Sequence, residues 1–369
     1  MTTVYLHIGA PKTATSTVQS LLADNDSRLL SQGVLYPKSM RLGAAHHMLV
    51  CDLIDKYHKH PMPDIWYGSH PRGVAWDKLN EEINAQKKRP KSVIVSSELF
   101  IGQVVGIDKA LRDMASHLDG FDVKVVVYLR RQDQLYSSFY NQDIKGVRQW
   151  RASAFEFYET HQMLRADYME LLRPWSKTFG KENIVLRPFD SAQWPNQSIV
   201  DEVSEAFGGL TLKSRSSAHE NAGLGPVQLY LKRCLNRIGF DKEDNDAVLD
   251  ILGKIIFEDP TGNCQFINPP MYRRYRHHWQ KVNEQLSKQF LGGQPLFTSE
   301  IPPVKEVEFY KFDRFTLAIA LHNLIELLAK KRYRKYRALF ARAAFLAIAE
   351  EDMWEAVKKE RYDRMLEWV

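Results

Sequence analysis

Four short runs rich in β-branched residues recur along the first 210 residues and constrain the fold more than any other feature. They are VYLHI at 4–8, SVIVSSE at 92–98, VKVVVYLR at 123–130 and NIVLRPF at 183–189. Each run is continuously apolar rather than alternating, which is typical of strands that are covered on both faces. Polar or helix-like sequence bounds each run, and the fourth is followed by SIVDEVSEAFG at 198–208, a short helix that stops at a glycine. We therefore predict an α/β fold, with a mostly parallel central sheet flanked by helices.

The C-terminal part of the chain is predicted to be helical. From about residue 226 the strand pattern fades, and the amphipathic segments at 225–239 and 271–293 each end at glycine. A stretch with paired prolines, 296–313, is typical of a linker, and helical periodicity resumes at about residue 314. We predict an α/β domain over 1–295, with its core strands within 1–210 and a helical part at 211–295. A helical C-terminal extension follows over 296–369.

Charge, cysteine content and hydropathy set limits on compartment and partners. The chain carries 51 Lys and Arg against 45 Asp and Glu, an excess that favours anionic partners only weakly. Its cysteines, Cys51, Cys234 and Cys264, lie far apart without a metal-ligand spacing, which indicates a reducing compartment without disulfides. The N-terminal MTTVYLHIGA lacks the basic and apolar regions of a signal peptide, and no apolar stretch reaches the roughly 20 residues of a membrane span. We expect a cytoplasmic protein.

The segment HIGAPKTATSTVQSLL at 7–22 joins the first predicted strand to a helix. A tight turn between a strand and a helix directs backbone N–H groups and the positive end of the helix dipole at one point, where a phosphate binds well. Lys12 adds a full positive charge, and the hydroxyl groups of nearby side chains add donors or helix caps. A Walker A loop is not present, because Gly9 lies only three residues before Lys12 and Pro11 takes the place of the second glycine. The alternative is an ordinary capped helix with a solvated lysine.

These residues also support a family resemblance. The loop is similar to the 5′-phosphosulfate loop, P-K-[ST]-G-[ST]-[ST], of sulfotransferases that use 3′-phosphoadenosine 5′-phosphosulfate (PAPS). The positions that match are Pro11, Lys12, Thr13, Thr15 and Ser16, and the departure is Ala14, where the family has glycine. A second segment, VVVYLRRQDQLYSSFYNQ at 125–142, is similar to the family's 3′-phosphate motif through Arg130, Ser138 and Tyr140. The resemblance spans roughly residues 1–210 and is nearest to the bacterial carbohydrate sulfotransferase-like branch.

The resemblance implies a P-loop NTPase-like sulfotransferase fold and the transfer of a sulfuryl group from PAPS to a hydroxyl of an acceptor, most simply a carbohydrate or glycoconjugate. It implies that Lys12 stabilises the departing phosphate oxygen, a task that needs no metal. The residues that would bind the donor are Pro11, Lys12, Thr13, Ala14, Thr15, Ser16, Thr17, Arg130 and Ser138. Arg131 and Ser137 are adjacent to two of these and are open alternatives to them.

Two residues are candidates for the base that takes the acceptor's proton. Glu98 follows the second predicted strand, at the sheet edge where open α/β proteins carry their sites. His47 belongs to a histidine pair with His46, and a histidine titrates near working pH. We place Glu98 first and His47 second. The alternatives are a helix cap for the acid and a structural role for the histidines.

Two further segments have partner-binding composition. The loop at 57–76 holds Trp66, Tyr67 and Trp76, whose rings either stack on a sugar or fasten the loop to the core. The basic run KKRYRKYR at 330–337 suits anionic lipid, charged polysaccharide or nucleic acid, or is a solvated helix face. Of these we retain peripheral membrane contact as the candidate partner, and we expect no nucleic-acid partner. The sequence does not predict the oligomeric state.

Two other functions remain open at this point. A phosphotransferase with an aberrant Walker loop would need a metal-binding carboxylate after a strand, for which Asp133 is the candidate. A non-catalytic module would keep the nucleotide fold and recognise a glycan or another anionic surface through its basic helices.

Overall fold

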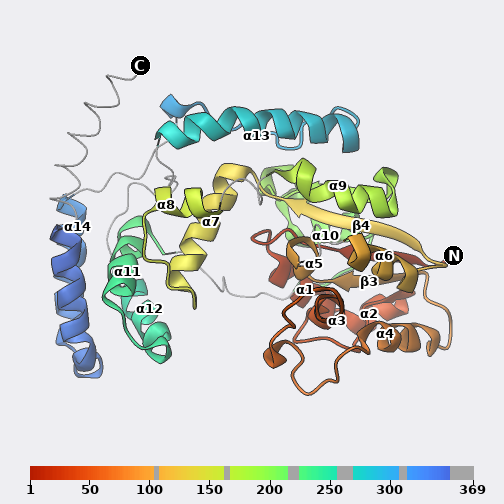
Figure 1. The fold of residues 1–369 in the computed structure, drawn as a ribbon, viewed down its shortest axis with the longest axis horizontal. Coiled ribbons are helices and arrows are strands. Elements are labelled where there is room, and N and C mark those ends of the chain that lie inside the picture. The colour runs from red at the N-terminus through yellow and green to blue at the C-terminus, as the bar shows by residue number, and fades with distance from the viewer. Residues whose placement is uncertain (104–107, 162–166, 215–223, 256–268, 307–313, 350–369) are drawn as a thin grey trace. The chain divides into compact units, whose positions relative to one another are not determined.

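The computed structural model describes residues 1–103, 108–161, 167–214, 224–255, 269–306 and 314–349. Its centre is a parallel sheet of five strands in the order β2-β3-β1-β4-β5, with helices on its faces (Figure 1). The strands are β1 (Thr3–His7), β2 (Val34–Leu35), β3 (Ser92–Ser96), β4 (Asp122–Leu129) and β5 (Ile184–Pro188). The predicted α/β fold class is therefore confirmed. The sequence missed only β2, whose two residues are too few to form a recognisable pattern.

The strands are buried on both faces, as their continuous apolar character predicts. Val126 and Tyr128 of β4 join a core cluster with Val18 of α1 (Thr15–Asp24) and Phe207, which follows α10 (Ile199–Ala206). Val127, between the two β4 residues, points to the opposite face and is also fully buried. Burial of this kind favours folding by about 1.5 to 3 kcal/mol for each large apolar side chain.

Helices make up most of the remaining described chain. Between residues 26 and 179 they are α2 (Asp26–Ser31), α3 (His47–Tyr57), α4 (Ala75–Asn84), α5 (Leu99–Gln103), α6 (Asp108–His117), α7 (Gln132–Lys145), α8 (Ala154–His161) and α9 (Tyr168–Phe179). The C-terminal part contains α11 (Pro226–Ile238), α12 (Asn245–Gly253), α13 (Pro269–Phe290) and α14 (Arg314–Ala329), followed by the 3₁₀ helix η8 (Lys331–Tyr336) and a helix over 337–349. The predicted helical C-terminal region is confirmed.

By its contacts the chain divides into two units. The first contains the described parts of residues 1–135, 163–218 and 275–301, and the second those of 136–162, 219–274 and 302–369. The second unit has a core of its own, which α11, α12, α14 and the helix over 337–349 build together. These units are discontinuous along the chain, whereas the sequence predicts one boundary between 295 and 296. That boundary stays a prediction.

Within the described ranges, every helix is too short or too polar to span a bilayer. The same residues include no cluster of three or more His, Cys, Asp or Glu side chains arranged to hold a metal ion. Cys51 and Cys234 are buried free thiols, and Cys264 lies outside the described residues.

Candidate active site

The topology brings three strand ends together in the first unit. Strand β1 pairs with β3 on one side and with β4 on the other, and all three run parallel. The loops that follow them therefore leave the sheet along one edge, where open α/β sheets carry their sites. These loops hold Lys12, Glu98 and Arg130.

The loop after β1 is held against β4 by backbone hydrogen bonds. The N–H groups of Ile8 and Ala10 donate to the carbonyls of Val126 and Tyr128 at 3.0 and 2.9 Å, and Tyr128 N–H donates to Gly9 at 2.8 Å. The Gly9–Ala10 peptide is cis. Gly9 also lies close to the end of the neighbouring strand β3: a Cβ added to it would lie 3.2 Å from Glu98 Cα. The loop is thus a fixed feature of this edge.

The loop then turns sharply into helix α1. Lys12 and Ala14 have positive φ angles of 68° and 52°, and Ala14 is the left-handed N-cap residue of α1. Glycine adopts this conformation without strain. This accounts for the glycine that the sulfotransferase loop motif has at the position of Ala14. The hydroxyl of Thr13 donates to the carbonyl of Ala10 at 2.5 Å and so braces the turn from within.

The N-terminus of α1 lacks the side-chain cap that its hydroxyl residues suggested. Among the described residues no side-chain cap bonds to its first amides, and helix geometry leaves those N–H groups without acceptors inside the helix. Thr15 is buried, whereas Ser16 and Thr17 are exposed and Pro11 and Lys12 are half-buried. The amides, the exposed hydroxyls and the lysine therefore belong to one short turn.

Arg130 lies at the end of β4 and reaches the same turn. Its Nη1 donates to the backbone carbonyl of Lys12 at 3.3 Å, and its guanidinium lies 5.7 Å from the ring centre of Phe189. Burial lowers the pKa of this guanidinium, and its buried Nε has no acceptor among the described residues. A half-buried arginine with an unused buried donor suits an anionic ligand.

The neighbouring arginine has a different set of contacts. Arg131 donates from Nε and Nη2 to the two carboxylate oxygens of Asp133 at 2.8 and 2.9 Å, and from Nη1 to Ser299 Oγ at 2.9 Å. Asp133 is fully buried. Of the two adjacent arginines, Arg130 is thus the one that faces the loop. Ser138 lies on the part of α7 that belongs to the second unit, so its pairing with Arg130 stays a prediction.

Glu98 and His47, the two candidate bases, lie close together. His47 Nε2 is 3.9 Å from Glu98 Oε1, and its Nδ1 is 2.8 Å from the hydroxyl oxygen of Ser97. Gln19 of α1 donates from Nε2 to Glu98 Oε2 at 2.8 Å. Burial lowers the pKa of His47, and the negative charge of Glu98 partly opposes this effect. Both side chains retain some exposure, 12% for His47 and 25% for Glu98.

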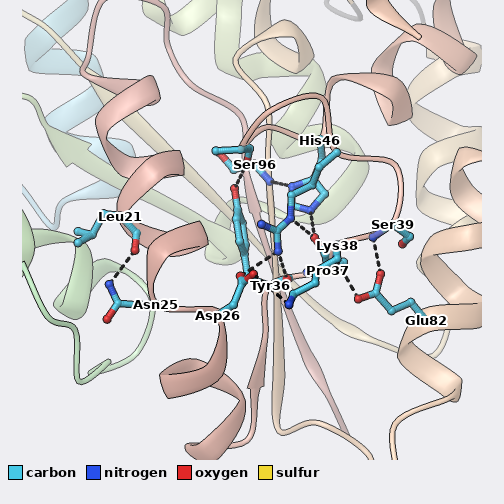
Figure 2. Close-up of polar contacts among 12 residues, drawn as sticks. Leu21, Asn25, Asp26, Tyr36, Pro37, Lys38, Ser39, His46, Glu82 and Ser96 are labelled. Carbon is cyan, nitrogen blue, oxygen red and sulfur yellow. Dashed lines mark hydrogen bonds and ion pairs between the residues drawn. The ribbon is translucent and has the colours of Figure 1, made fainter. Parts of the chain in front are cut away.

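His46, the other member of the pair, is a structural residue. Its Nδ1 accepts from the N–H of Ser96 at 3.2 Å, so the proton is on Nε2, which donates to the carbonyl of Pro37 at 2.9 Å (Figure 2). Its own N–H donates to the carbonyl of Ser96 at 2.8 Å, so this histidine binds the last residue of β3 on both backbone groups. Burial lowers its pKa to about 4. His46 thereby fixes the strand end from which Ser97 and Glu98 follow.

The aromatic loop at 57–76 is tied to the protein by ion pairs. Arg72 pairs with Asp55 and Asp64, and Tyr67 is buried with its hydroxyl donating to Asp55 at 2.9 Å. This leaves Trp66 half-buried, with its ring edge-on to His47 at 5.4 Å between centroids. Tyr67 therefore anchors the loop, whereas Trp66 contacts a candidate base.

Sequence reasoning missed Gln19 and Ser97, which hold the candidate bases in place. Gln19 lies next to Val18 on the buried side of α1 and is itself buried. The signal in the sequence was a polar residue within the apolar stripe of a predicted helix. Ser97 carried no signal that distinguished it from its neighbour Ser96.

Comparison with known proteins gives little further guidance. No family model matches the chain. An uncharacterized protein of Archaeoglobus fulgidus is 23% identical over 262 residues, which is 69% of this chain and 67% of the relative. A crystal structure of a sulfotransferase from Alicyclobacillus acidocaldarius aligns with a TM-score of 0.37 and 17% identity, over 67% of this chain and 94% of that one. Likeness at this level does not establish a function for this chain.

Proposed function

We propose that the protein is a sulfotransferase that moves a sulfuryl group from PAPS to a hydroxyl of an acceptor, with a carbohydrate or glycoconjugate as the expected acceptor class. The observation that carries this proposal is the contact between Arg130 and the carbonyl of Lys12. Through it, the two segments that resemble the donor-binding motifs meet at one edge of the sheet. The candidate bases lie on the adjacent strand end.

The turn at 11–17 suits the 5′ end of the donor. Sulfuryl transfer breaks the bond between sulfur and the bridging phosphate oxygen, and negative charge develops on that oxygen. The first amides of α1 and the positive end of its dipole favour such charge. Lys12 supplies a full charge from the same turn, and Ser16 and Thr17 offer exposed hydroxyl donors. Arg130 would then bind another phosphate of the same nucleotide.

The Glu98 and His47 pair suits the acceptor side. As the acceptor oxygen bonds to sulfur, its proton must pass to a base. Ser97 Oγ accepts from the N–H of Leu99 at 3.3 Å, so its own proton is available to His47 Nδ1. In that arrangement His47 Nε2 carries a hydrogen that points toward Glu98, and Glu98 is the base. The opposite histidine tautomer would make His47 the base, and we keep Glu98 first.

The phosphotransferase alternative loses its metal-ligand candidate. Asp133 is fully buried and both its oxygens accept from Arg131, so it has little capacity left for a magnesium ion. The non-catalytic alternative keeps the nucleotide site, and turnover separates it from the enzyme. Donor binding without sulfation across a broad panel of sugar acceptors would favour the binding module.

The test is calorimetric titration with 3′-phosphoadenosine 5′-phosphate. We expect Lys12→Ala and Arg130→Ala each to weaken binding by about 1.5 to 3 kcal/mol, the worth of a charge-assisted contact, which is tenfold or more in Kd. Lys87→Ala and Arg28→Ala remove exposed charges of the same kinds and should leave Kd unchanged. If the wild type does not bind, or if all five proteins bind alike, the donor assignment is wrong.

A further inference from the structure

The second unit exposes apolar side chains on two consecutive helices near its C-terminal end. Among the described residues, half of the large exposed apolar side chains lie there: Ile319 and Ile325 on α14, and Phe345 and Ile348 on the helix over 337–349. Phe345 is 76% exposed and Ile325 is 66% exposed. Scattered single side chains of this kind are ordinary, but a concentration on neighbouring elements indicates a contact surface.

On the helix over 337–349 these side chains form a continuous stripe. Ala338, Ala341, Phe345 and Ile348 are exposed and follow spacings of three, four and three residues, so they lie along one helix face. The opposite face is packed into the core of the second unit through Phe340, Ala343 and Ala347. The hydroxyl of Tyr230 donates to the carbonyl of Ala347 at 3.0 Å and fixes this orientation. The stripe therefore faces outward in the folded unit.

Helix α14 has the same arrangement. Its buried side, including Leu324 and Leu327, joins the same core cluster. Its exposed side consists of Ala318, Ile319, His322, Ile325, Glu326 and Ala329. Glu326 is the one acidic residue in the sequence from 314 to 349, which contains eight Lys or Arg.

The turn between the two helices presents most of this positive charge. In η8, Tyr333 and Tyr336 are buried and donate to Asp250 and Asp244 at 3.0 and 2.8 Å. Arg337 donates to the carbonyls of Leu328 and Ala329 at the end of α14. These contacts hold the turn in place. The basic side chains exposed around it are Lys330, Lys331, Arg332, Arg334, Lys335 and Arg337, of which Lys335 pairs with Asp244 at 2.9 Å.

We propose that α14, η8 and the helix over 337–349 form a surface that binds an anionic lipid bilayer. The apolar stripe would enter the boundary between headgroups and acyl chains, and the basic turn would attract the negative headgroups. Charge and apolar content favour this occupant over a second copy of the chain and over a nucleic acid. A second copy of the chain would bring two strongly basic turns together, and a nucleic acid would make no use of Phe345 and Ile348. Residues 350–369, outside the described part, are the other candidate cover for the stripe, since seven of them are acidic and four are basic.

The experiment is flotation of the full-length protein with vesicles of phosphatidylcholine, alone or with about 30 mol% phosphatidylserine, at low and high salt. We expect binding to the anionic vesicles only, and its loss at about 0.5 M salt. Phe345→Glu and the double variant Lys331→Glu/Arg332→Glu should each weaken binding by about tenfold or more. Val147→Glu, at a residue of the same unit that is 81% exposed, and Lys87→Glu/Lys88→Glu are the matched controls and should bind as the wild type does. Thermal melting checks that each variant is folded.

Four outcomes would overturn the proposal. The first is equal binding by all variants, and the second is no binding by a folded wild type. A third is no vesicle binding together with a lower melting temperature for Phe345→Glu but not for Val147→Glu, which would mean that the stripe is covered by the chain itself. The fourth is the absence of vesicle binding together with binding of another partner. That partner would be a second copy of the chain if sedimentation shows self-association that Phe345→Glu abolishes, or RNA if RNA binding needs Lys331 and Arg332 but not Phe345. None of these readouts depends on sulfuryl transfer, so the proposed function stands or falls separately.

Discussion

The role of His46 as a neutral structural residue makes a sharp prediction about acid stability. Its Nδ1 accepts from the N–H of Ser96, so a proton on that nitrogen would place two hydrogens against each other. Burial lowers the pKa of this imidazole from 6.5 to about 4. A histidine whose pKa is lowered in the folded state binds fewer protons when folded than when unfolded. Its contribution to stability is therefore complete above pH 6.5 and is lost as the pH falls toward 4.

The size of the effect follows from the two pKa values. Between pH 7 and pH 4.5, a shift of this size lowers the free energy of unfolding by about 2 kcal/mol, at 1.36 kcal/mol for each pKa unit that is fully expressed. In His46→Asn, the amide oxygen can still accept from Ser96 N–H but carries no titratable proton. We expect the variant to be less stable at pH 7 by about 2 kcal/mol, because it loses the Pro37 contact and part of the ring packing on Tyr36. Its further loss between pH 7 and pH 4.5 should be smaller than that of the wild type by a similar amount.

The measurement is urea denaturation of both proteins at several pH values from 7 to 4.5. His60→Asn serves as the control, because that ring is exposed on the surface. The control should follow the wild-type curve. Parallel loss of stability in the wild type and in His46→Asn would refute the reasoning, because His46 would then not be a buried neutral group.

The remaining predictions concern the loop, the buried ion pair and the candidate bases. Ala14→Gly should raise the free energy of unfolding by about 0.5 to 1 kcal/mol, because the strain of a left-handed alanine is larger than the extra chain entropy that glycine loses on folding. A lower urea midpoint would contradict this. Asp133→Asn should lower the free energy of unfolding by about 3 kcal/mol, since it leaves the guanidinium of Arg131 without its paired carboxylate, and an unchanged urea midpoint would argue against that pairing. Glu98→Gln should slow sulfuryl transfer roughly 100-fold or more, whereas full activity at neutral pH would assign the base to His47. Because the charge of Glu98 raises the pKa of His47, the acid limb of any activity left in Glu98→Gln should move to lower pH, as a pH–rate profile would record.

The main elements of the fold were predictable because their signals are local. The five consecutive fully buried residues of β4, at 125–129, have to be apolar, and this pattern is visible in the sequence. The turn at 11–17 was equally visible, since a lysine and several hydroxyls between a strand and a helix form a compact pattern. Strand order was not predictable in the same way, because β2 is short and the pairing of β1 with both β3 and β4 depends on contacts far along the chain.

The sequence by itself determined the α/β class, the helical C-terminal region and a turn suited to bind phosphate. It also gave a short set of candidate site residues: Lys12, Glu98, Arg130 and a histidine pair. Only the tertiary structure decided among them. His47 lies beside Glu98, whereas His46 bonds to the end of β3. Arg131 pairs with Asp133, whereas Arg130 donates to the carbonyl of Lys12, 118 positions away in the sequence. It also brought Gln19 to Glu98 across 79 positions. The physical reason is that a side chain's role depends on the partners it meets, and adjacent residues of the same type meet different partners once the chain is folded.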